Sequence, residues 1–434
     1  MRQKIHFIGI GGIGVSALAR FYLHSGTGVS GSDLVSSEIT EELKRIGVNI
    51  VIGKHARTNI PKGTNLAIYT SATSKDNPER LEAKKRKIKT LSYAEALGEI
   101  TKKYKTITVS GSHGKSTTTA MAALVLEEGY FDPTVIIGTK LKEFGGSNFR
   151  AGKGSYLMLE ADEWNKSFLK YSPYIAIVTI IDAEHLDTYK SLKGAQKVFA
   201  MFLKKVPKGG MIIANKDNKP LFEVAKKFKK NVIWYSLDDP EAQKIRSLLR
   251  VPGEHNISNA LAAYRLGKLL GMPESAILKA LGRFSGTWRR FDIRGSFQGA
   301  TIIDDYGHHP TEIKATIKAA REKYPFRRIW CVYQPHQYQR LAYLWKDFIQ
   351  AFDMADTICL LPVYDVAGRE TKASKTKVNS EKLSHELLKR GKQSFHCNSF
   401  AEAKKLLSSR IKKDDIVLMM GAGDIYKLSE EMVA

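Results

Sequence analysis

At two places the chain passes from a short apolar run, through a glycine-rich turn, into a helical pattern. The first is HFIGIGGIGVSALA at residues 6–19, and the second is TVSGSHGKSTTTAM at residues 108–121. A strand that leads through a tight turn into a helix begins a βαβ unit, and the strands of such units pair in parallel. These two passages therefore predict an α/β protein.

Apolar runs of strand length recur along the whole chain and alternate with helical segments. They lie at residues 4–10, 27–33, 65–72, 106–112, 155–161, 174–180, 209–215, 231–237, 300–306, 328–334, 357–363 and 415–421. A chain of 434 residues exceeds what one core usually covers. We expect three α/β domains, at residues 1–98, 99–292 and 293–434. The first and third are predicted to be Rossmann-like and the central one to be of P-loop type.

The composition is strongly basic, with 69 Lys and Arg against 44 Asp and Glu, a formal charge of +25. Such a charge attracts anions, but the lysines lie along amphipathic helices, which favours a solvated basic surface. No nucleic-acid-binding motif accompanies them, so no nucleic-acid partner is expected. No apolar run reaches membrane-spanning length, and no signal-peptide pattern is present. Cys331, Cys359 and Cys397 lack metal spacing and are typical of a cytoplasmic protein.

The first glycine-rich turn fits G-x-G-x-x-G through Gly9, Gly11 and Gly14. Its backbone N–H groups and the following helix N-terminus would face a diphosphate. Asp33 ends the next predicted strand, where a dinucleotide fold places the carboxylate that binds a ribose. On these residues alone a nicotinamide-dependent dehydrogenase is a fair hypothesis. A turn that only packs a strand on a helix is the alternative.

The second turn, GSHGKS, lacks the first glycine of a full Walker A motif but retains the glycine, lysine and serine that end that motif. Gly111 and Gly114 let the backbone approach phosphate, and Lys115 supplies positive charge. Ser116 or Thr117 can bind Mg²⁺. The turn therefore predicts an ATP-type phosphate site, which a dehydrogenase does not need.

Two further candidates follow strands of the same predicted domain. Glu160 closes the run at residues 155–161, and His185 follows the run at residues 174–180. Ligands of open α/β sheets gather at the carboxyl ends of strands, so these side chains could hold one or two Mg²⁺ ions on a triphosphate. A lone loop histidine is an equally open reading of His185.

Taken in order, the motifs of the chain resemble those of the Mur ligases, ATP-dependent amide-forming enzymes of peptidoglycan synthesis. They are GIGGIG, SATSKDNPE, GSHGKSTTTAM, EADE, HLDTY, PGEHNISNALAA, GTWRRFD, DDYGHHPTEI, YQPHQYQR and MGAGDIY. The resemblance covers essentially the whole chain. DDYGHHPTEI, YQPH and GIGGIG are typical of the type that adds L-alanine to UDP-N-acetylmuramate in cell-wall biogenesis.

The resemblance implies a reaction in which the two turns serve different substrates. The N-terminal turn would hold the UDP-sugar diphosphate, and the central turn would hold ATP. The sugar's lactyl carboxylate would take the γ-phosphate, and the amine of alanine would attack the resulting acyl phosphate. ADP and phosphate would leave, with Mg²⁺ as cofactor.

The resemblance also implies roles for individual residues. The catalytic residues would be Lys115, Glu160, His185 and Arg290. ATP would contact Gly111, Ser112, His113, Gly114, Lys115, Ser116, Thr117, Asn256, Asn259, Arg290 and Asp305. The UDP-sugar would contact Gly11, Gly12, Ile13, Gly14, Asp33, Ser71 and His185. The amino-acid pocket would include His308, His309 and Arg340. The metal ligands would be Ser116, Glu160 and His185.

Several residues depart from the family pattern. Trp164 and Asn165 stand where the family usually has Ser and Asp, and Gln337 stands where a second Arg is typical. These departures leave amino-acid selectivity open. A non-catalytic nucleotide-binding relative therefore remains an alternative to the ligase, as does the less favoured dehydrogenase. The oligomeric state does not follow from the sequence.

Overall fold

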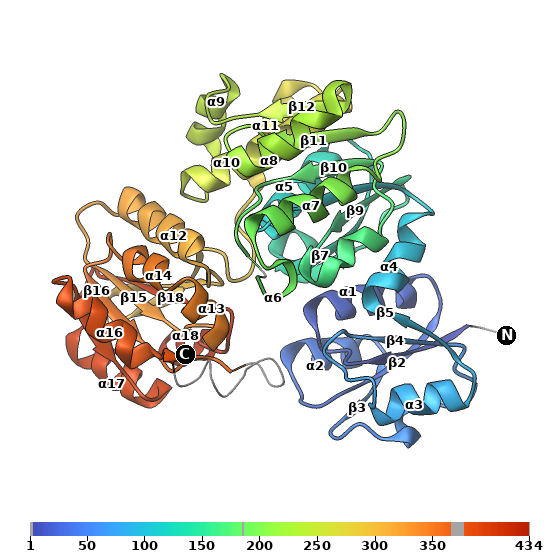
Figure 1. Cartoon of the computed structure of the whole chain (residues 1–434), viewed down its shortest axis with the longest axis horizontal. Coiled ribbons are helices and arrows are strands. Elements are labelled where there is room, and N and C mark those ends of the chain that lie inside the picture. The colour runs from blue at the N-terminus through green and yellow to red at the C-terminus, as the bar shows by residue number, and fades with distance from the viewer. Residues whose placement is uncertain (1–2, 185, 366–376, 434) are drawn as a thin grey trace. The chain divides into compact units, whose positions relative to one another are not determined.

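The computed structural model describes residues 3–184, 186–365 and 377–433. The chain forms two compact units (Figure 1). The first unit comprises Met1–Leu248 and Ser258–Phe284, and the second comprises Leu249–Ile257 and Ser285–Ala434. The first unit contains two β-sheets and the second contains one.

The first sheet has five parallel strands in the order β3-β2-β1-β4-β5. The strands are β1 (Lys4–Ile8), β2 (Gly28–Asp33), β3 (Asn49–Ile52), β4 (Leu66–Tyr69) and β5 (Lys89–Ser92). The helices are α1 (Ile13–His24), α2 (Glu38–Arg45), α3 (Pro78–Lys85) and α4 (Tyr93–Thr101), with the 3₁₀ helix η1 (Arg57–Asn59). The strand order reverses at β1, which places the turn after β1 at a ligand-binding switch point.

Local sequence explains where these helices begin. Ser37 and Ser92 form capping boxes at the starts of α2 and α4. Asn77 accepts hydrogen bonds from the first turn of α3, and Pro78 follows it at the position where a missing N–H costs nothing. α1 has no side-chain cap, because Gly12 stands at that position. Its first N–H groups are therefore not covered by a capping side chain.

The second sheet has seven strands in the order β12-β11-β10-β6-β9-β7-β8, and only the β7–β8 hairpin is antiparallel among the described pairs. The strands are β6 (Lys105–Ser110), β7 (Thr134–Leu141), β8 (Ser147–Arg150), β9 (Tyr156–Glu160), β10 (Ile175–Val178), β11 (Met211–Asn215) and β12 (Val232–Tyr235). The helices are α5 (Lys115–Glu128), α6 (Leu186–Tyr189), α7 (Leu192–Leu203), α8 (Lys219–Ala225), α9 (Glu241–Leu248), α10 (Glu254–Leu269), α11 (Glu274–Arg283), η2 (Lys142–Phe144), η3 (Trp164–Lys170) and η4 (Lys226–Asn231).

The third sheet, in the second unit, has six strands in the order β13-β14-β18-β15-β16-β17, with β13 antiparallel to β14. The strands are β13 (Asp292–Phe297), β14 (Ala300–Asp305), β15 (Ile329–Tyr333), β16 (Thr357–Leu360), β17 (Gln393–His396) and β18 (Ile416–Met420). The helices are α12 (Pro310–Lys323), α13 (Tyr338–Tyr343), α14 (Trp345–Ala351), α16 (Ser380–Lys389), α17 (Phe400–Arg410) and α18 (Tyr426–Val433).

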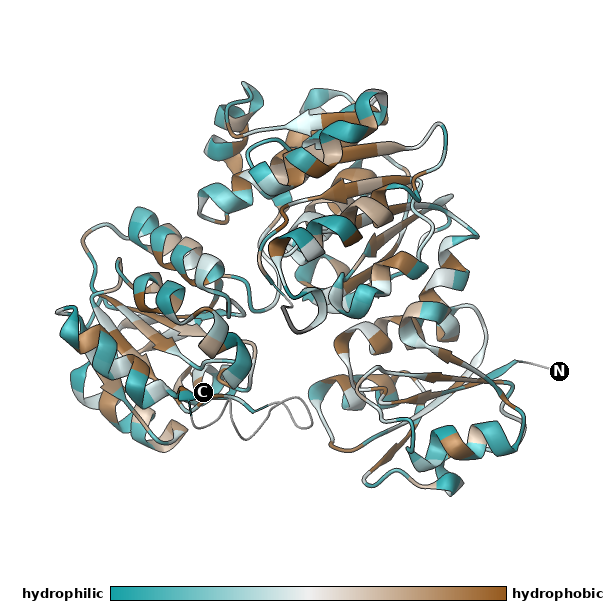
Figure 2. Cartoon of the chain, viewed as in Figure 1, coloured by the Kyte–Doolittle hydropathy of each residue, from teal (hydrophilic) through white to brown (hydrophobic). Residues whose placement is uncertain are grey.

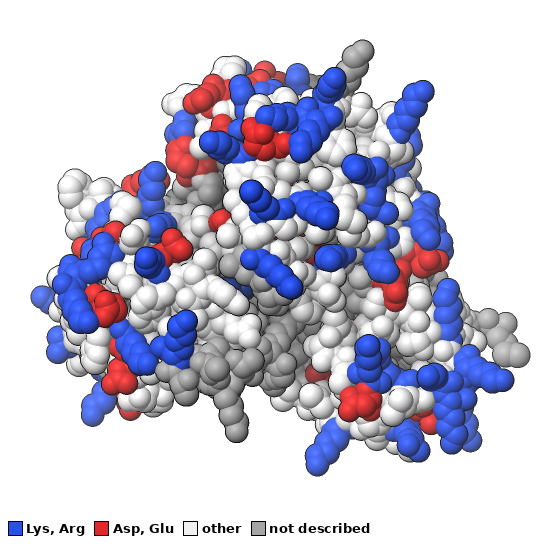
Figure 3. Space-filling model, in the orientation of Figure 1, with Lys and Arg blue, Asp and Glu red and all other residues white. Residues whose placement is uncertain are grey.

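Three mostly parallel α/β sheets confirm the predicted fold class. Hydrophobic residues concentrate on the strands, which are largely brown in Figure 2, and many of these residues are buried. Lys and Arg are spread over the visible face in Figure 3, with fewer Asp and Glu among them. Cys331, Cys359 and Cys397 are buried free cysteines. Among the described residues no helix is both long and apolar enough to cross a membrane. The predicted domain boundaries stay predictions.

Candidate active site

The central glycine-rich turn connects β6 to α5, and its two glycines adopt backbone angles that other residues rarely take. Gly111 has φ +136° and Gly114 has φ +81°. A Cβ atom at Gly111 would lie 2.1 Å from the Thr179 hydroxyl, and one at Gly114 would lie 2.4 Å from Asn259 Oδ1. Neither position tolerates a side chain, so the turn keeps its backbone N–H groups accessible at the start of α5.

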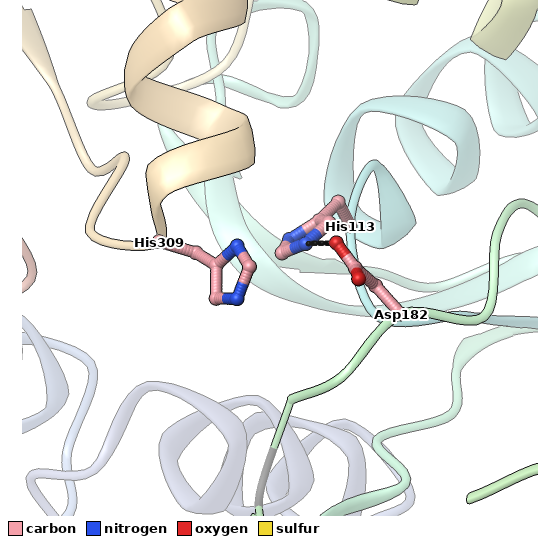
Figure 4. Close-up of side chains that lie close together, drawn as sticks. All are labelled: His113, Asp182 and His309. Carbon is pink, nitrogen blue, oxygen red and sulfur yellow. Dashed lines mark hydrogen bonds and ion pairs between the residues drawn. The ribbon is translucent and has the colours of Figure 1, made fainter. Parts of the chain in front are cut away.

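This turn is held by the segment that follows β10. Thr179 donates its hydroxyl hydrogen to the carbonyl of His113 (2.5 Å), and the Asp182 N–H donates to the Ser112 hydroxyl (2.9 Å). The imidazole of His113 lies 3.2 Å from the Asp182 carboxylate (Figure 4). These bonds fix the turn before any ligand binds, which is the preorganisation that phosphate binding requires.

Lys115, the first residue of α5, is surrounded by acidic side chains. Its ammonium lies 2.7 Å from the Gly111 carbonyl and 3.0 Å from the Glu163 carboxylate. Burial alone would lower the pKa of Lys115, but nearby carboxylates, Glu163 foremost, raise it above its ordinary value. Burial raises the pKa of Glu163 to about 7, although Lys115 opposes that change. The lysine is therefore a permanent positive charge at the phosphate turn.

Ser116 and Glu160 form the pair of oxygens that the sequence assigned to a metal. The Ser116 hydroxyl lies 3.0 Å from Glu160 Oε1, and the Gly138 N–H donates to Glu160 Oε2 at 2.8 Å. Burial raises the pKa of Glu160, a penalty that a bound cation would offset. Neighbouring ligands of an octahedral Mg²⁺ lie about 3 Å apart, because each lies about 2.1 Å from the ion. The pair therefore fits Mg²⁺ in both chemistry and spacing. His185 lies outside the described residues.

The N-terminal turn is closed by the carboxylate that the sequence singled out. The Gly11 N–H donates to Asp33 Oδ2 at 2.7 Å, and the Gly9 and Ile10 N–H groups donate to the Ser32 carbonyl. Gly12 and Ile13 then begin α1. A Cβ atom at Gly11 would lie 2.9 Å from Asp33 Oδ2. The structure thus brings Gly11 and Asp33 together at the carboxyl ends of β1 and β2.

Two further contacts surround this turn. A Cβ atom at Gly14 would lie 2.7 Å from the Tyr93 hydroxyl, and one at Gly9 would lie 2.4 Å from the Thr70 methyl group. Ser71, which directly follows Thr70, is exposed. Ser71 is therefore next to a residue that contacts the turn, and its assignment to the uridine stays a prediction.

Beneath the N-terminal turn lies a buried carboxylate that the sequence did not single out. Glu79 Oε2 accepts from Ser32 (2.8 Å) and lies 2.9 Å from His6 Nε2. Its other oxygen accepts from Asn59 (2.9 Å) and lies 2.7 Å from His55 Nδ1. Burial opposes the ionisation of Glu79, but these hydrogen bonds lower its pKa to about 2. This network ties β1, β2 and α3 together.

The two asparagines of α10 belong to different units. Asn259 lies in the first unit, beside Gly114 of the central turn. Asn256 lies in the second unit, where its amide donates to the Pro252 carbonyl at 2.6 Å. Both side chains are buried. The contact with Gly114 supports a place for Asn259 at the nucleotide.

In the second unit Arg290 lies just before β13, and Asp305 is the last residue of β14. Arg290 donates to the Glu312 carboxylate at 3.2 Å and lies over the Tyr306 ring. Asp305 accepts the N–H groups of Phe291 and Gly307, both at 2.8 Å. Burial raises the pKa of Asp305, while Arg290 opposes the rise. Arg290 and Asp305, both predicted to bind the nucleotide, are thus electrostatically coupled.

The predicted amino-acid pocket draws its side chains from the segments after β14 and β15. Arg340 lies 3.1 Å from His336 Nδ1, and the His336 ring lies 5.7 Å from that of His308. His309 caps α12 by accepting the Thr311 N–H at 3.3 Å. The structure therefore places His308 and Arg340 on either side of His336. The His309 side chain instead caps the N-terminus of α12. His336 was not assigned a role from the sequence, although it is the histidine of the YQPH motif.

Glu163 and Asp182 were also not assigned. Glu163 is the last residue of EADE, and the available signal was that this motif has three carboxylates, of which only Glu160 was assigned. Asp182 contacts the central turn from a loop, and loop residues of this kind carry no periodic signal.

Comparisons with known proteins match all three sheets. Three family models match in succession: "Mur ligase family, catalytic domain" at residues 4–105, "Mur ligase middle domain" at residues 109–267, and "Mur ligase, glutamate ligase domain" at residues 289–423. Together they span most of the chain.

Curated relatives and a solved structure agree with these matches. The chain is 40% identical to a UDP-N-acetylmuramate–L-alanine ligase of Clostridium botulinum (strain Okra / Type B1), across 99% of this chain and 97% of that protein. It is 40% identical to the ligase of the same name from Alkaliphilus metalliredigens, across 100% of this chain and 97% of that protein. The structure is also similar to the crystal structure of the Thermotoga maritima UDP-N-acetylmuramate-alanine ligase MurC, with a TM-score of 0.83. The two sequences are 28% identical, and the match covers 100% of this chain and 98% of that chain.

Proposed function

Because the chain belongs to the Mur ligase family, we propose that it joins L-alanine to the lactyl carboxylate of UDP-N-acetylmuramate, with ATP as co-substrate. The observation that carries this proposal is the 40% identity to curated ligases of that name over essentially the full length of both proteins. The reaction belongs to the synthesis of peptidoglycan precursors. The cytoplasm is its expected location.

The proposed reaction proceeds in two displacements. A lactyl carboxylate oxygen attacks the γ-phosphorus of ATP, the bond to the β,γ-bridging oxygen breaks, and ADP leaves. The amine of alanine then attacks the carbonyl carbon of the acyl phosphate. Phosphate leaves, the nitrogen loses a proton, and the amide remains. Phosphoryl transfer of this kind depends on positioning and on compensating charge rather than on covalent help from the protein.

Lys115 provides that compensating charge at the central turn. The first displacement brings a carboxylate up to a triphosphate, and both are anions. The charge of Lys115 is secured by the carboxylates around it, so it is present throughout the working pH range. The backbone N–H groups at the start of α5 would bind the phosphates. Arg290 is proposed to add charge at the γ-phosphate.

We propose Mg²⁺ as the cofactor, held by Ser116 and Glu160, which fit it in chemistry and spacing. His185 is proposed as a ligand of a second ion. When bound, Mg²⁺ neutralises charge on the phosphate oxygens. Glu160 contributes a partly buried carboxylate that the Gly138 N–H orients toward Ser116. Orientation of a ligand by a neighbouring hydrogen bond is a general feature of metal sites.

The N-terminal turn is proposed to hold the diphosphate of the UDP-sugar, with Asp33 and Ser71 near the uridine. The uncapped N-terminus of α1 supports this assignment, because its N–H groups and helix dipole favour an anion. His308 and Arg340 are proposed to line the amino-acid pocket. A guanidinium suits the alanine carboxylate because it can donate two parallel hydrogen bonds.

Release of ADP tests the proposal. We expect it to require ATP, Mg²⁺, UDP-N-acetylmuramate and an amino acid, and to be fastest with L-alanine. UDP-N-acetylglucosamine is the matched control substrate, because it has the same UDP group but no lactyl carboxylate. Turnover without the carboxylate, or a large amino acid that outcompetes alanine, would contradict the proposal. Product analysis should show an amide between alanine and the lactyl group.

A further inference from the structure

The β7–β8 hairpin reaches the metal-binding carboxylate of the central site through its backbone. The Gly138 N–H on β7 donates to Glu160 Oε2, whose partner oxygen contacts Ser116. A Cβ atom at Gly138 would lie 3.0 Å from both Glu160 oxygens. The strand is therefore in direct contact with Glu160, and a movement of β7 at this point would move the carboxylate as well.

Two residues further along β7, Lys140 forms ion pairs with a helix of the N-terminal sheet. The Lys140 ammonium lies 2.7 Å from Glu42 and 2.9 Å from Glu38, both on α2. Glu42 also binds Arg20 of α1 at 2.8 Å. Lys140 is buried. These ion pairs connect the hairpin to the two helices that follow β1 and β2, the strands that end at Ile8 and Asp33.

Asn148 on β8 contacts the first turn of α1 itself. Its Nδ2 donates to the Ile13 carbonyl at 2.6 Å and to the Ser16 hydroxyl at 2.8 Å. The orientation of the amide is fixed, because the Ile13 carbonyl can only accept and the Ser16 hydroxyl donates its hydrogen to that same carbonyl. Asn148 Oδ1 is buried without a hydrogen-bond partner among the described residues. Such a group is costly to bury, and this cost offsets part of the stability that the two Nδ2 hydrogen bonds contribute.

A second connection runs beside the hairpin. The Tyr93 hydroxyl lies against Gly14 of the N-terminal turn. Burial, together with the nearby charges of Glu160 and Asp162, raises the pKa of this phenol. Tyr93 therefore lies against the N-terminal turn, and the charges of the central site act on its phenol.

We propose that the β7–β8 hairpin couples the occupancy of the two phosphate sites, with Lys140 and Asn148 as its positioning residues. Binding of the UDP-sugar at the N-terminus of α1 would fix α1 and α2, and with them Asn148 and Lys140. The hairpin would then hold Gly138 where it orients Glu160 for the metal and ATP. This inference rests on the proposed function, because it needs one ligand at each turn.

The test measures the affinity for UDP-N-acetylmuramate with and without a non-hydrolysable ATP analogue and Mg²⁺. Coupled sites commonly change each other's affinity by about fivefold or more, and the wild type should show such a factor. Asn148→Ala and Lys140→Met should reduce the factor to less than about twofold. Lys142→Met is the matched control, since Lys142 is an exposed lysine of the same hairpin, and it should keep the wild-type factor.

Asn148→Leu serves as a second variant in case Asn148→Ala folds poorly, because it removes the unpartnered oxygen and fills the space. It should lose the coupling while its melting temperature stays at or above that of the wild type. A wild type without coupling, or variants that retain it, would overturn the inference. A wild type that ligates alanine but shows no coupling leaves the proposed function intact, whereas a wild type that fails to bind UDP-N-acetylmuramate overturns both.

Discussion

The ammonium of Lys115 and the carboxylate of Glu163 form a largely buried ion pair 3.0 Å long at the entrance to α5. A triphosphate that reaches Lys115 has to replace this carboxylate as the lysine's main partner. Because one anion replaces another, the lysine stays charged and its buried charge stays paired. The pair therefore keeps a positive charge in place within the turn, where we propose that phosphate binds.

Removal of that charge should impair chemistry more than folding. Loss of one preorganised donor at a developing charge typically costs about 3–4 kcal/mol in the transition state, a few hundredfold in rate. We expect Lys115→Ala to lower kcat by at least about a hundredfold while UDP-sugar affinity stays near normal. Steady-state ADP release measures kcat, and isothermal titration with UDP-N-acetylmuramate measures the affinity for the UDP-sugar. Near-normal turnover would reject the assignment.

Glu160→Gln should weaken metal binding, because an amide oxygen carries no charge to attract Mg²⁺. The Mg²⁺ concentration for half-maximal activity should rise by about tenfold or more. Direct titration with Mn²⁺, followed by electron paramagnetic resonance, reads the same site without turnover. Asp162→Asn is the matched control, since Asp162 belongs to the same motif but is not bonded to Ser116. Equal effects of the two substitutions would contradict the site.

Gly11→Val should affect the N-terminal turn alone. A Cβ atom there would lie 2.9 Å from Asp33 Oδ2 and 3.1 Å from the Thr40 methyl group, so the turn must open. UDP-sugar affinity should fall by at least about a hundredfold, while affinity for the ATP analogue stays within about twofold. Loss of ATP binding alone would mean that the two turns are assigned the wrong way round.

Gln337→Arg should strengthen alanine binding. Gln337 precedes α13, three residues before Arg340, and a second arginine would add a charged donor for the substrate carboxylate. A charge-assisted hydrogen bond contributes roughly 1.5–3 kcal/mol, which corresponds to a Michaelis constant for alanine about ten- to a hundredfold lower. The constant for ATP should not change. Gln339→Arg adds the same charge two residues away and should have little effect; an unchanged alanine dependence in Gln337→Arg would remove residue 337 from the pocket.

Glu79→Gln should destabilise the protein in a pH-dependent way. The folded pKa of Glu79, about 2, lies below its ordinary value of 4.5, so the carboxylate stabilises the fold fully above about pH 4.5. That contribution, roughly 3 kcal/mol from the difference in pKa, is lost as the pH falls toward 2. Urea unfolding of both proteins at pH 7 and at pH 4 should show a smaller difference at pH 4. The variant Glu82→Gln is the control on the same helix, and a constant difference would contradict this account.

The sequence predicted the central strands of each sheet and both glycine-rich turns, because buried parallel strands have continuous apolar runs. It missed β3, β5, β8, β13 and β17, which lie at sheet edges, and β7, which lies inside the second sheet between β9 and β8. Edge strands are short and partly exposed, so their pattern resembles that of a loop. The missed hairpin strand β7 includes Gly138 and Lys140, and it contributes most to the inferred coupling.

The residues that we propose to touch ligands were largely named from the spacing of motifs in the sequence. The residues that hold those side chains were not. Asp182, Asn148 and Glu79 act through partners 69, 135 and 73 residues away in the sequence. Contacts at such separations depend on the tertiary fold, and a single sequence carries no local sign of them.

The chain passes between the two compact units three times, after Leu248, after Ile257 and after Phe284. α10 therefore begins in one unit and ends in the other. Neither unit is one uninterrupted stretch of sequence, so a truncation at residue 285 would leave the C-terminal fragment without residues 249–257. A gene fragment that supplies the whole second unit must begin by Leu249, and it then also encodes residues 258–284 of the first.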